Sequence, residues 1–204
     1  MTKKSLIFAA ALVASISIAG VASAQTSPFE GFYVGGQVGY SNINVEVSVA
    51  GVGSADDNLD GFGGGGFIGF GGTNGQIYGA IEAELGYDGA DWSATSGGLT
   101  ADVEARLAFG LGARIGGVIS DRYLIYGRAG WVRTNAELSI TGIGSDDEDF
   151  DGFRFGGGVE AMLADNIGAR AEYTYTIYDD PFDVSGVAFD INQHLFRIGV
   201  AYYF

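Results

Sequence analysis

The last nine residues of the chain place apolar side chains along the whole of one strand face. That face holds Phe196, Ile198, Val200, Tyr202 and the terminal Phe204. The positions between them, from Arg197 to Tyr203, are charged, small or polar at the ring edge. Successive side chains of a strand point to opposite sides, so one side of this strand needs contact with hydrocarbon. The pattern favours a membrane-spanning β-barrel.

The amino end predicts export. Lys3 and Lys4 precede an apolar run that starts at Leu6, and the run ends in the small residues Ala22-Ser23-Ala24. A charged start, an apolar middle and a small-residue exit form a secretory signal peptide. We therefore predict a signal over residues 1–24 and a mature barrel domain over residues 25–204. The alternative is a membrane anchor of about twenty residues, which the polar residues after Ala24 disfavour.

The charge balance narrows the function classes. The chain holds 25 acidic residues against 10 basic ones, and both of its lysines lie in the predicted signal. A surface this acidic repels the phosphates of nucleic acids, so we expect no nucleic-acid partner. There is no cysteine, and the chain has neither a disulfide framework nor a thiolate metal site. We expect no cofactor.

Period-two alternation recurs through the mature chain, and turn residues interrupt it. The clearest run is Asp102 to Gly116, where odd positions are apolar and even positions are charged or small. Eight segments show this pattern: 32–40, 62–70, 77–87, 102–116, 123–131, 153–163, 167–177 and 196–204. The sequence thus predicts an all-β fold, an eight-stranded antiparallel up-and-down transmembrane β-barrel.

The links between these segments alternate in length. Short links are predicted at 71–75, 120–122 and 164–166, and long loops at 47–60, 88–101, 140–150 and 180–190. Bacterial barrels have short periplasmic turns and longer external loops, which places both termini in the periplasm. The alternation from Ile43 to Val49 has the opposite parity to Phe32 and Val34. Strand 1 then either carries a bulge or leaves the membrane near Tyr40, and we favour an external extension.

Charged residues gather on the predicted inner faces. They are Glu82, Glu84, Glu104, Arg106, Arg114, Arg128, Arg154, Glu160, Arg170, Glu172 and Arg197. An eight-stranded barrel is only wide enough to be filled by its own side chains, so these groups meet in a confined interior. One interpretation is a structural network of ion pairs. The other is a narrow path for ions or solutes, and the sequence does not separate the two.

Three further motifs predict other chemistry and are weaker. The segment Asp147 to Gly152 matches the start of a calcium loop, but Gly158 stands where the bidentate Glu belongs. The glycines of Gly61 to Gly66 match a dinucleotide fingerprint without its βαβ context. His194 is the only histidine, and its nearest candidate triad partners, Ser185 and Asp190, lie in the preceding loop. We expect no metal site and no enzyme activity.

Several segments resemble a known family. The hairpin Asn166 to Thr176, the ending Phe196 to Phe204 and the runs Ile77 to Tyr87 and Tyr126 to Gly130 are similar to the small opacity/porin-like outer-membrane proteins. This is the OmpA-like β-barrel domain group of Gram-negative bacteria. The resemblance implies an outer-membrane location, support of envelope integrity, and loops that face the environment or a host. It also implies that the barrel-assembly machinery reads Phe196, Ile198, Val200, Tyr202 and Phe204 as an assembly signal.

The resemblance leaves alternatives open. The chain ends at Phe204 without the peptidoglycan-binding domain of full-length OmpA, so a tether to the cell wall is not implied. The candidate functions are a structural and surface-interaction barrel, a passive small-solute porin and a lipid-modifying enzyme. The expected partners are outer-membrane lipids and lipopolysaccharide, the assembly machinery, and an extracellular or host ligand of the loops.

Overall fold

A computed structural model describes residues 27–49, 53–87, 89, 91–96, 99–140, 144–179 and 187–204. The predicted signal over residues 1–24 lies outside this range. The described residues form nine strands: β1 (Gly31–Val49), β2 (Gly53–Asn74), β3 (Ile77–Tyr87), β4 (Asp91–Ser96), β5 (Leu99–Ile119), β6 (Tyr123–Ile140), β7 (Gly144–Ala164), β8 (Ile167–Tyr178) and β9 (Val187–Tyr203). No helix among the described residues is long and apolar enough to cross a membrane.

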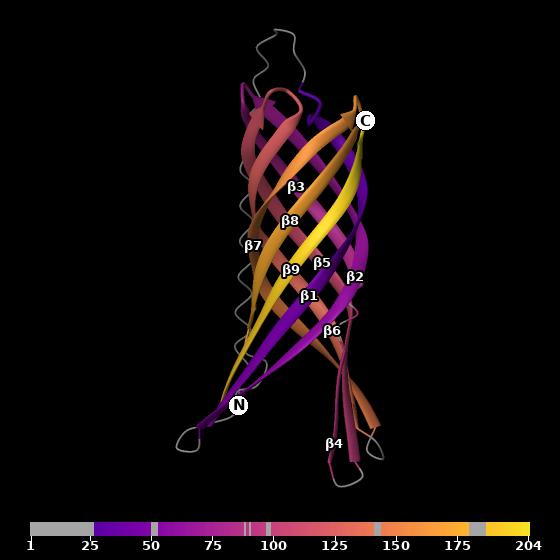
Figure 1. Ribbon diagram of the computed structural model, residues 1–204, viewed down its shortest axis with the longest axis vertical. Coiled ribbons are helices and arrows are strands. Elements are labelled where there is room, and N and C mark those ends of the chain that lie inside the picture. The colour runs from indigo at the N-terminus through magenta and orange to yellow at the C-terminus, as the bar shows by residue number, and fades with distance from the viewer. Residues whose placement is uncertain are drawn as a thin grey trace, which may run out of the picture.

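The strands close into one barrel (Figure 1). Strands that follow one another in the chain pair antiparallel, except β3 and β4, and β1 closes the ring by pairing with β9. β3 and β4 both pair with β5, and so act as successive segments of one strand of the wall. The closed barrel therefore has eight strands around its circumference, and the predicted fold class is confirmed.

The outer surface of the barrel is apolar, as alternation requires. Aliphatic side chains such as Ile68, Ile81 and Ile115 are more than half exposed. Aromatic side chains flank them at two levels. Phe32, Phe70 and Tyr202 lie near the short turns, and Tyr40, Phe62, Tyr87, Phe109, Trp131 and Phe153 lie nearer the opposite end. On β1 the two levels are separated by the distance from Phe32 to Tyr40, and on β2 by that from Phe62 to Phe70. Each separation is close to the length of a tilted strand that spans a bilayer.

The two ends of the barrel differ. The turns β2–β3, β5–β6 and β7–β8 occupy two or three residues each and lie at the same end as the carboxyl terminus, which we name the turn end (Figure 1). Gly75 in the first of these turns has φ of 63°, a backbone conformation that favours glycine. The predicted short links at 120–122 and 164–166 agree with the structure, whereas β2 continues to Asn74 through most of the link predicted at 71–75.

The opposite end, named here the hairpin end, corrects the prediction of long loops at 47–60, 88–101 and 140–150. Residues 180–186 of the fourth predicted loop lie outside the described residues. β1 and β2 pair without interruption from Gly31↔Gly71 to Val49↔Gly53, so most of the predicted loop 47–60 is paired strand. β4, β5, β6 and β7 likewise extend into the segments predicted as loops. Paired strands satisfy their backbone groups without needing an apolar face, so an extension beyond the lipid need not show alternation. The run from Ile43 to Val49 does show it, and it is the extension that the sequence favoured.

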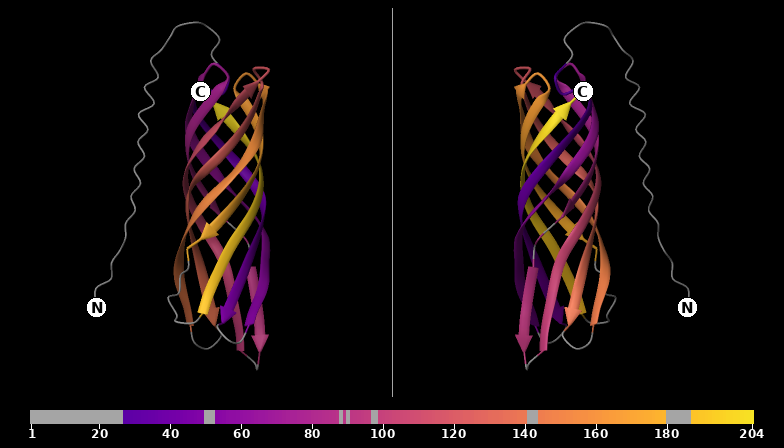
Figure 2. Two further views of the ribbon diagram at one scale, coloured as in Figure 1. Left: turned by 90° about the vertical axis from the view of Figure 1, so that its left-hand side faces the viewer. Right: turned by 90° about the vertical axis from the view of Figure 1, so that its right-hand side faces the viewer.

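The extensions form two separate sheets at the hairpin end (Figures 1 and 2). Pairing of β2 with β3 begins only at Gly64↔Tyr87, and pairing of β7 with β8 only at Gly152↔Tyr178. Beyond these points, β9, β1 and β2 make one sheet, and β4, β5, β6 and β7 make the other. The favoured interpretation of strand 1 agrees with this arrangement, because β1 runs outward with an unbroken register on both sides.

Depth in the bilayer gives a test of the assigned outer face. Ile115 and Ile119 lie on the same face of β5, near mid-span and at the turn end, and both are exposed. We expect Ile115→Arg to lower the free energy of unfolding by about 2–4 kcal/mol and Ile119→Arg by about 0–1 kcal/mol, because the cost of a charge in lipid depends on depth. Denaturant titrations of the protein refolded in lipid vesicles measure both values. Equal losses in the two variants would contradict the assigned orientation.

Candidate functional site

The barrel lumen collects the charged side chains of the inner strand faces. The structure describes nine of the eleven predicted residues there, each only 1–6% exposed: Glu82, Glu84, Arg114, Arg128, Arg154, Glu160, Arg170, Glu172 and Arg197. They come from β3, β5, β6, β7, β8 and β9, so residues far apart in sequence meet in one interior. Alternation puts them there, since the other face of each strand is taken up by apolar side chains.

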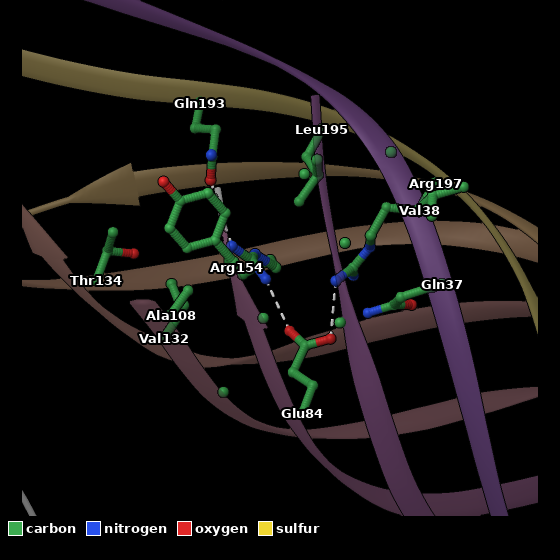
Figure 3. Close-up of a pocket in the computed structure, with 17 residues that line it drawn as sticks. Gln37, Val38, Glu84, Ala108, Val132, Thr134, Arg154, Gln193, Leu195 and Arg197 are labelled. Atoms are coloured by element: carbon green, nitrogen blue, oxygen red, sulfur yellow. Dashed lines mark hydrogen bonds and ion pairs between the residues drawn. The ribbon is translucent and has the colours of Figure 1, made fainter. Parts of the chain in front are cut away.

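One group of these charges consists of Arg128, Arg154 and Arg197 around Glu84 and Glu172, and we name it the outer group. Figure 3 shows its members Glu84, Arg154 and Arg197. Arg154 Nη1 lies 2.7 Å from Glu84 Oε1, and Arg197 Nη1 lies 2.8 Å from Glu84 Oε2. Arg197 and Arg128 also reach Glu172 Oε1, at 2.5 and 2.8 Å. Three guanidinium groups therefore share two carboxylates.

A second group lies next to it and is named the inner group. Arg170 Nη1 lies 2.8 Å from Glu82 Oε2, and Arg114 Nη2 lies 2.8 Å from Glu160 Oε2. Arg114 Nη1 also approaches Glu82, at 3.5 Å. Arg128 Nη1 lies 3.6 Å from Glu82 Oε1 and links the two groups into one network.

Sequence reasoning missed the tyrosines that complete this network. Tyr33 donates to Glu82 at 3.0 Å, Tyr126 to Glu172 at 3.0 Å, and Tyr203 to Glu160 at 2.6 Å. The Arg114 guanidinium carbon lies 3.7 Å from the centroid of the Tyr126 ring, a cation–π contact. The signal was available, because alternation places Tyr33, Tyr126 and Tyr203 on the inner faces of their strands, opposite the lipid-facing side chains.

On the turn-end side of the charged residues, apolar and aromatic side chains fill the lumen. Phe29, which precedes β1, packs edge-on against Tyr78 and Tyr203 with ring centroids 6.4 and 6.0 Å apart. Leu124 and Met162 belong to the same buried cluster. Each of these residues lies within a few positions of a short turn or a chain end, so the cluster fills the turn end of the barrel.

The prediction for Glu104 and Arg106 meets an irregularity in β5. The register with β6 shifts between Ala105 and Ala108, so one extra residue interrupts the alternation. The rule that even positions face inward therefore does not carry from Gly110 back to Glu104. The side chains of Glu104 and Arg106 lie outside the described residues, and their role stays a prediction.

The weaker motifs are placed as follows. The segment Asp147 to Gly152, which matches the start of a calcium loop, lies within β7 and pairs with β6. The glycines from Gly61 to Gly66 lie within β2. His194 alternates with the buried Gln193 and Leu195, and its Nδ1 lies 2.7 Å from the Tyr173 hydroxyl. Ser185 lies outside the described residues, and the described side chains contain no group of three potential metal ligands.

An ion pair marks the outer wall just beyond the aromatic side chains of the hairpin end. Arg133 Nε and Nη2 each donate to one oxygen of Asp151 at 2.8 Å, and both side chains are partly exposed. These hydrogen bonds hold the pKa of the Asp151 carboxyl below its ordinary value. The Arg133 guanidinium also lies over Trp131, 5.4 Å from the ring centroid. This pair fixes β6 to β7 where the wall leaves the apolar zone.

The residues predicted as an assembly signal share the lipid side of β9. Phe196, Ile198, Val200 and Tyr202 are 44–54% exposed, and Phe204 is 80% exposed. The Phe204 backbone N–H donates to the Phe32 carbonyl at 3.0 Å, and its ring lies edge-on to Tyr202. The carboxyl end is thus held in the wall while its ring stays accessible.

The family model of the outer membrane protein beta-barrel domain matches residues 8–204. The chain belongs to this family. The family resemblance and the outer-membrane location expected from the sequence are thereby confirmed.

Relatives agree with this assignment. The chain is 31% identical over 185 residues to the 22 kDa outer membrane protein of Rhizobium leguminosarum bv. viciae, with 85% of this chain and 78% of that protein covered. It is 30% identical over 178 residues to the 25 kDa outer-membrane immunogenic protein of Brucella melitensis, with the same coverage of each. Both relatives carry the names of outer membrane proteins.

A solved structure shares the fold at low identity. The outer membrane protease OmpT of Escherichia coli superposes with a TM-score of 0.53 at 7% sequence identity, over 89% of this chain and 99% of OmpT. At that identity the likeness shows a shared barrel fold alone.

Removing one lumen carboxylate tests the network. We expect Glu160→Ala to lower the free energy of unfolding by about 3–5 kcal/mol, because it leaves the buried Arg114 without its nearest carboxylate. Tyr203→Phe, which removes only the hydroxyl that donates to Glu160, should cost about 1–3 kcal/mol. Asp165→Ala in the exposed β7–β8 turn is the control, within about 0.5 kcal/mol of the unaltered protein. Denaturant unfolding measures all three, and a Glu160→Ala value equal to the control would contradict a buried, paired Glu160.

Proposed function

We propose that this protein is a structural barrel of the outer membrane that supports envelope integrity and presents its hairpin end to the surroundings, with a lumen closed by the Arg/Glu network. The observation that carries the proposal is the ion pair between Arg170 and Glu82, at 2.8 Å. Arg170 belongs to β8 and Glu82 to β3, which stand opposite each other in the ring of eight strands. A bond of this kind spans the lumen and leaves little room for a continuous path.

Two further features support closure. Side chains from β3, β7 and β9 meet at Glu84, so the outer group adds a second layer of contacts across the interior. The aromatic cluster around Phe29 and Tyr78 fills the turn end below both groups. A solute that entered from the hairpin end would need to displace charged pairs and then aromatic side chains.

The hairpin end supports a role at the surface. Its strands carry many acidic residues, including the run Asp146 to Asp149 of β7. The Brucella melitensis relative is named an immunogenic protein, which suggests that this part of the family meets a host. Divalent cations held among the lipopolysaccharide phosphates would screen the charge of such a rim. A basic extracellular ligand is the partner class that the rim favours.

A catalytic role has less support. His194 lies beside Tyr173 and Tyr175 on the outer wall. An acyl-transfer site needs a hydroxyl nucleophile, a base and an orienting carboxylate in hydrogen-bond reach of one another. The described side-chain contacts of His194 are the Tyr173 hydroxyl, which lies 2.7 Å from its Nδ1, and the rings of Tyr173 and Tyr175. A phenol beside an imidazole does not make up such a triad, and we infer a barrel without enzyme activity.

Conductance in planar bilayers tests the closed lumen. We expect no steady channels from the unaltered protein, and channels from the double variant Glu82→Gln with Arg170→Gln, because that variant removes the pair across the lumen at little change in side-chain volume. The control is Asp151→Asn with Arg133→Gln, which removes an ion pair of the outer wall and should not conduct. Steady channels from the unaltered protein comparable to those of the lumen variant would favour the passive porin instead.

The carboxyl end supports a second part of the proposal, recognition by the barrel-assembly machinery. We expect Phe204→Ala to reduce the amount of protein in the outer membrane several-fold while leaving the denaturant stability of the refolded protein almost unchanged. The substitution keeps the backbone hydrogen bond to Phe32 and removes only the exposed ring. Phe70→Ala, another lipid-facing ring near the turn end, is the control. Equal outer-membrane levels of the two variants in fractionated cells would count against an assembly signal.

A further inference from the structure

The described lumen charges do not balance, and the excess lies in one place. The inner group holds two arginines and two glutamates, joined at 2.8 Å in each of its main pairs. The outer group holds Arg128, Arg154 and Arg197 against Glu84 and Glu172. One guanidinium charge of the outer group therefore has no carboxylate of its own, although each of the three arginines is at most 6% exposed.

A cavity of about 50 Å³ adjoins this group. Its polar lining includes Gln37, Glu84, Thr134, Arg154, Gln193 and Arg197 (Figure 3). The Glu84 carboxylate is already bound by Arg154 and Arg197. Glycine backbone of β1, β2, β3 and β5 makes much of the remaining wall, so little side-chain volume fills the space. A cavity of this volume has room for a few water molecules or for an ion of similar size, and it is too small for an organic acid.

Two arginine side chains next to the cavity each have an N–H group that donates to no carboxylate. Arg197 Nε is buried and has no hydrogen-bond partner within the protein. Arg154 places Nη1 on Glu84, but its Nη2 faces the neutral amide oxygen of Gln193, at 3.3 Å. Glycine at position 39 keeps this arrangement possible, because a Cβ there would lie 2.8 Å from Arg197 Cγ and 2.6 Å from a backbone oxygen.

We propose that this cavity binds one small monovalent inorganic anion of halide size as the missing counter-ion of the outer group. An unpaired buried charge is strongly destabilising, and a paired one is tolerated. The volume selects a monatomic anion over an organic acid, and the arginine and amide donors supply the N–H groups that such an anion accepts from. The anion would act on folding stability, and the inference does not depend on whether the lumen conducts.

The first experiment compares sodium chloride with sodium gluconate at equal ionic strength, using the unaltered protein refolded in vesicles. Gluconate is too large for the cavity. Chloride should raise the denaturant midpoint in a saturable way, with the folding equilibrium constant rising about 100-fold at a concentration 100 times the dissociation constant. In bromide-grown crystals, anomalous scattering should show one bromide beside Arg197. Equal midpoints in the two salts, or a cavity without bromide, would overturn the proposal.

A charge substitution separates this site from a general salt effect. Gln193 Oε1 accepts from Arg154 and from Tyr178, and its Nε2 donates to Ser41 Oγ at 2.8 Å. Gln193→Glu keeps the accepting oxygen, lets the Ser41 hydroxyl donate instead, and places a carboxylate where the outer group lacks one. We expect this variant to lose the chloride dependence and to be more stable than the unaltered protein in gluconate.

Arg133→Gln is the matched control, since it removes one guanidinium from the outer wall and should retain the full chloride dependence. A Gln193→Glu protein that keeps the dependence would overturn the proposal. If that variant does not refold, the bromide measurement on the unaltered protein decides the question.

Discussion

Hydrocarbon around the wall is the constraint on which the rest of this structure depends. It requires every backbone group to be paired within the wall, which a closed ring of strands achieves without an exposed edge. It also requires one face of each strand to be apolar, as Ile68, Ile81 and Ile115 show by their exposure. Since side chains alternate, all remaining polarity of the spanning segments is directed inward. The charged lumen therefore follows from the requirement that the outer face of each strand be apolar.

The narrow ring then decides how those inward charges behave. With eight strands, the interior is only wide enough for side chains, so guanidinium and carboxylate groups from strands that are not neighbours come within 2.8 Å of each other. Taking such groups out of water is costly, and the cost is offset only when nearly every donor and acceptor is matched. The tyrosines that donate to Glu82, Glu160 and Glu172 supply part of that matching. The network thus stabilises the fold and fills the lumen through the same contacts.

The hairpin end obeys a different rule because water surrounds it. There the strands need no apolar face, and two separate sheets replace the closed ring beyond Gly64 and Gly152. The Arg133–Asp151 pair lies at the boundary between the apolar zone of the closed ring and the hairpin end, where the side chains of the outer wall change from aromatic to charged. The sequence of these extensions is rich in acidic residues, and charged side chains disfavour edge-to-edge pairing of exposed strands. The proposed role at the cell surface depends on this end, and the proposed support of envelope integrity depends on the closed ring of strands.

Period-two alternation determined the fold class, the number of strands around the ring, and the assignment of Arg114, Arg128, Arg154, Arg170 and Arg197 with four of the glutamates to one interior. These predictions succeeded because each strand by itself alternates between apolar side chains that face lipid and polar or small side chains that face the lumen. Alternation could not show the length of the strands beyond the lipid, where that contrast ends, or the extra residue between Ala105 and Ala108, which changes the parity in β5. Only the tertiary structure decided which carboxylate each arginine binds. It alone also revealed the hydrogen bonds of Tyr33, Tyr126 and Tyr203 and the excess guanidinium beside the cavity. Those depend on which strands stand opposite each other and at what stagger, and no single strand contains that information.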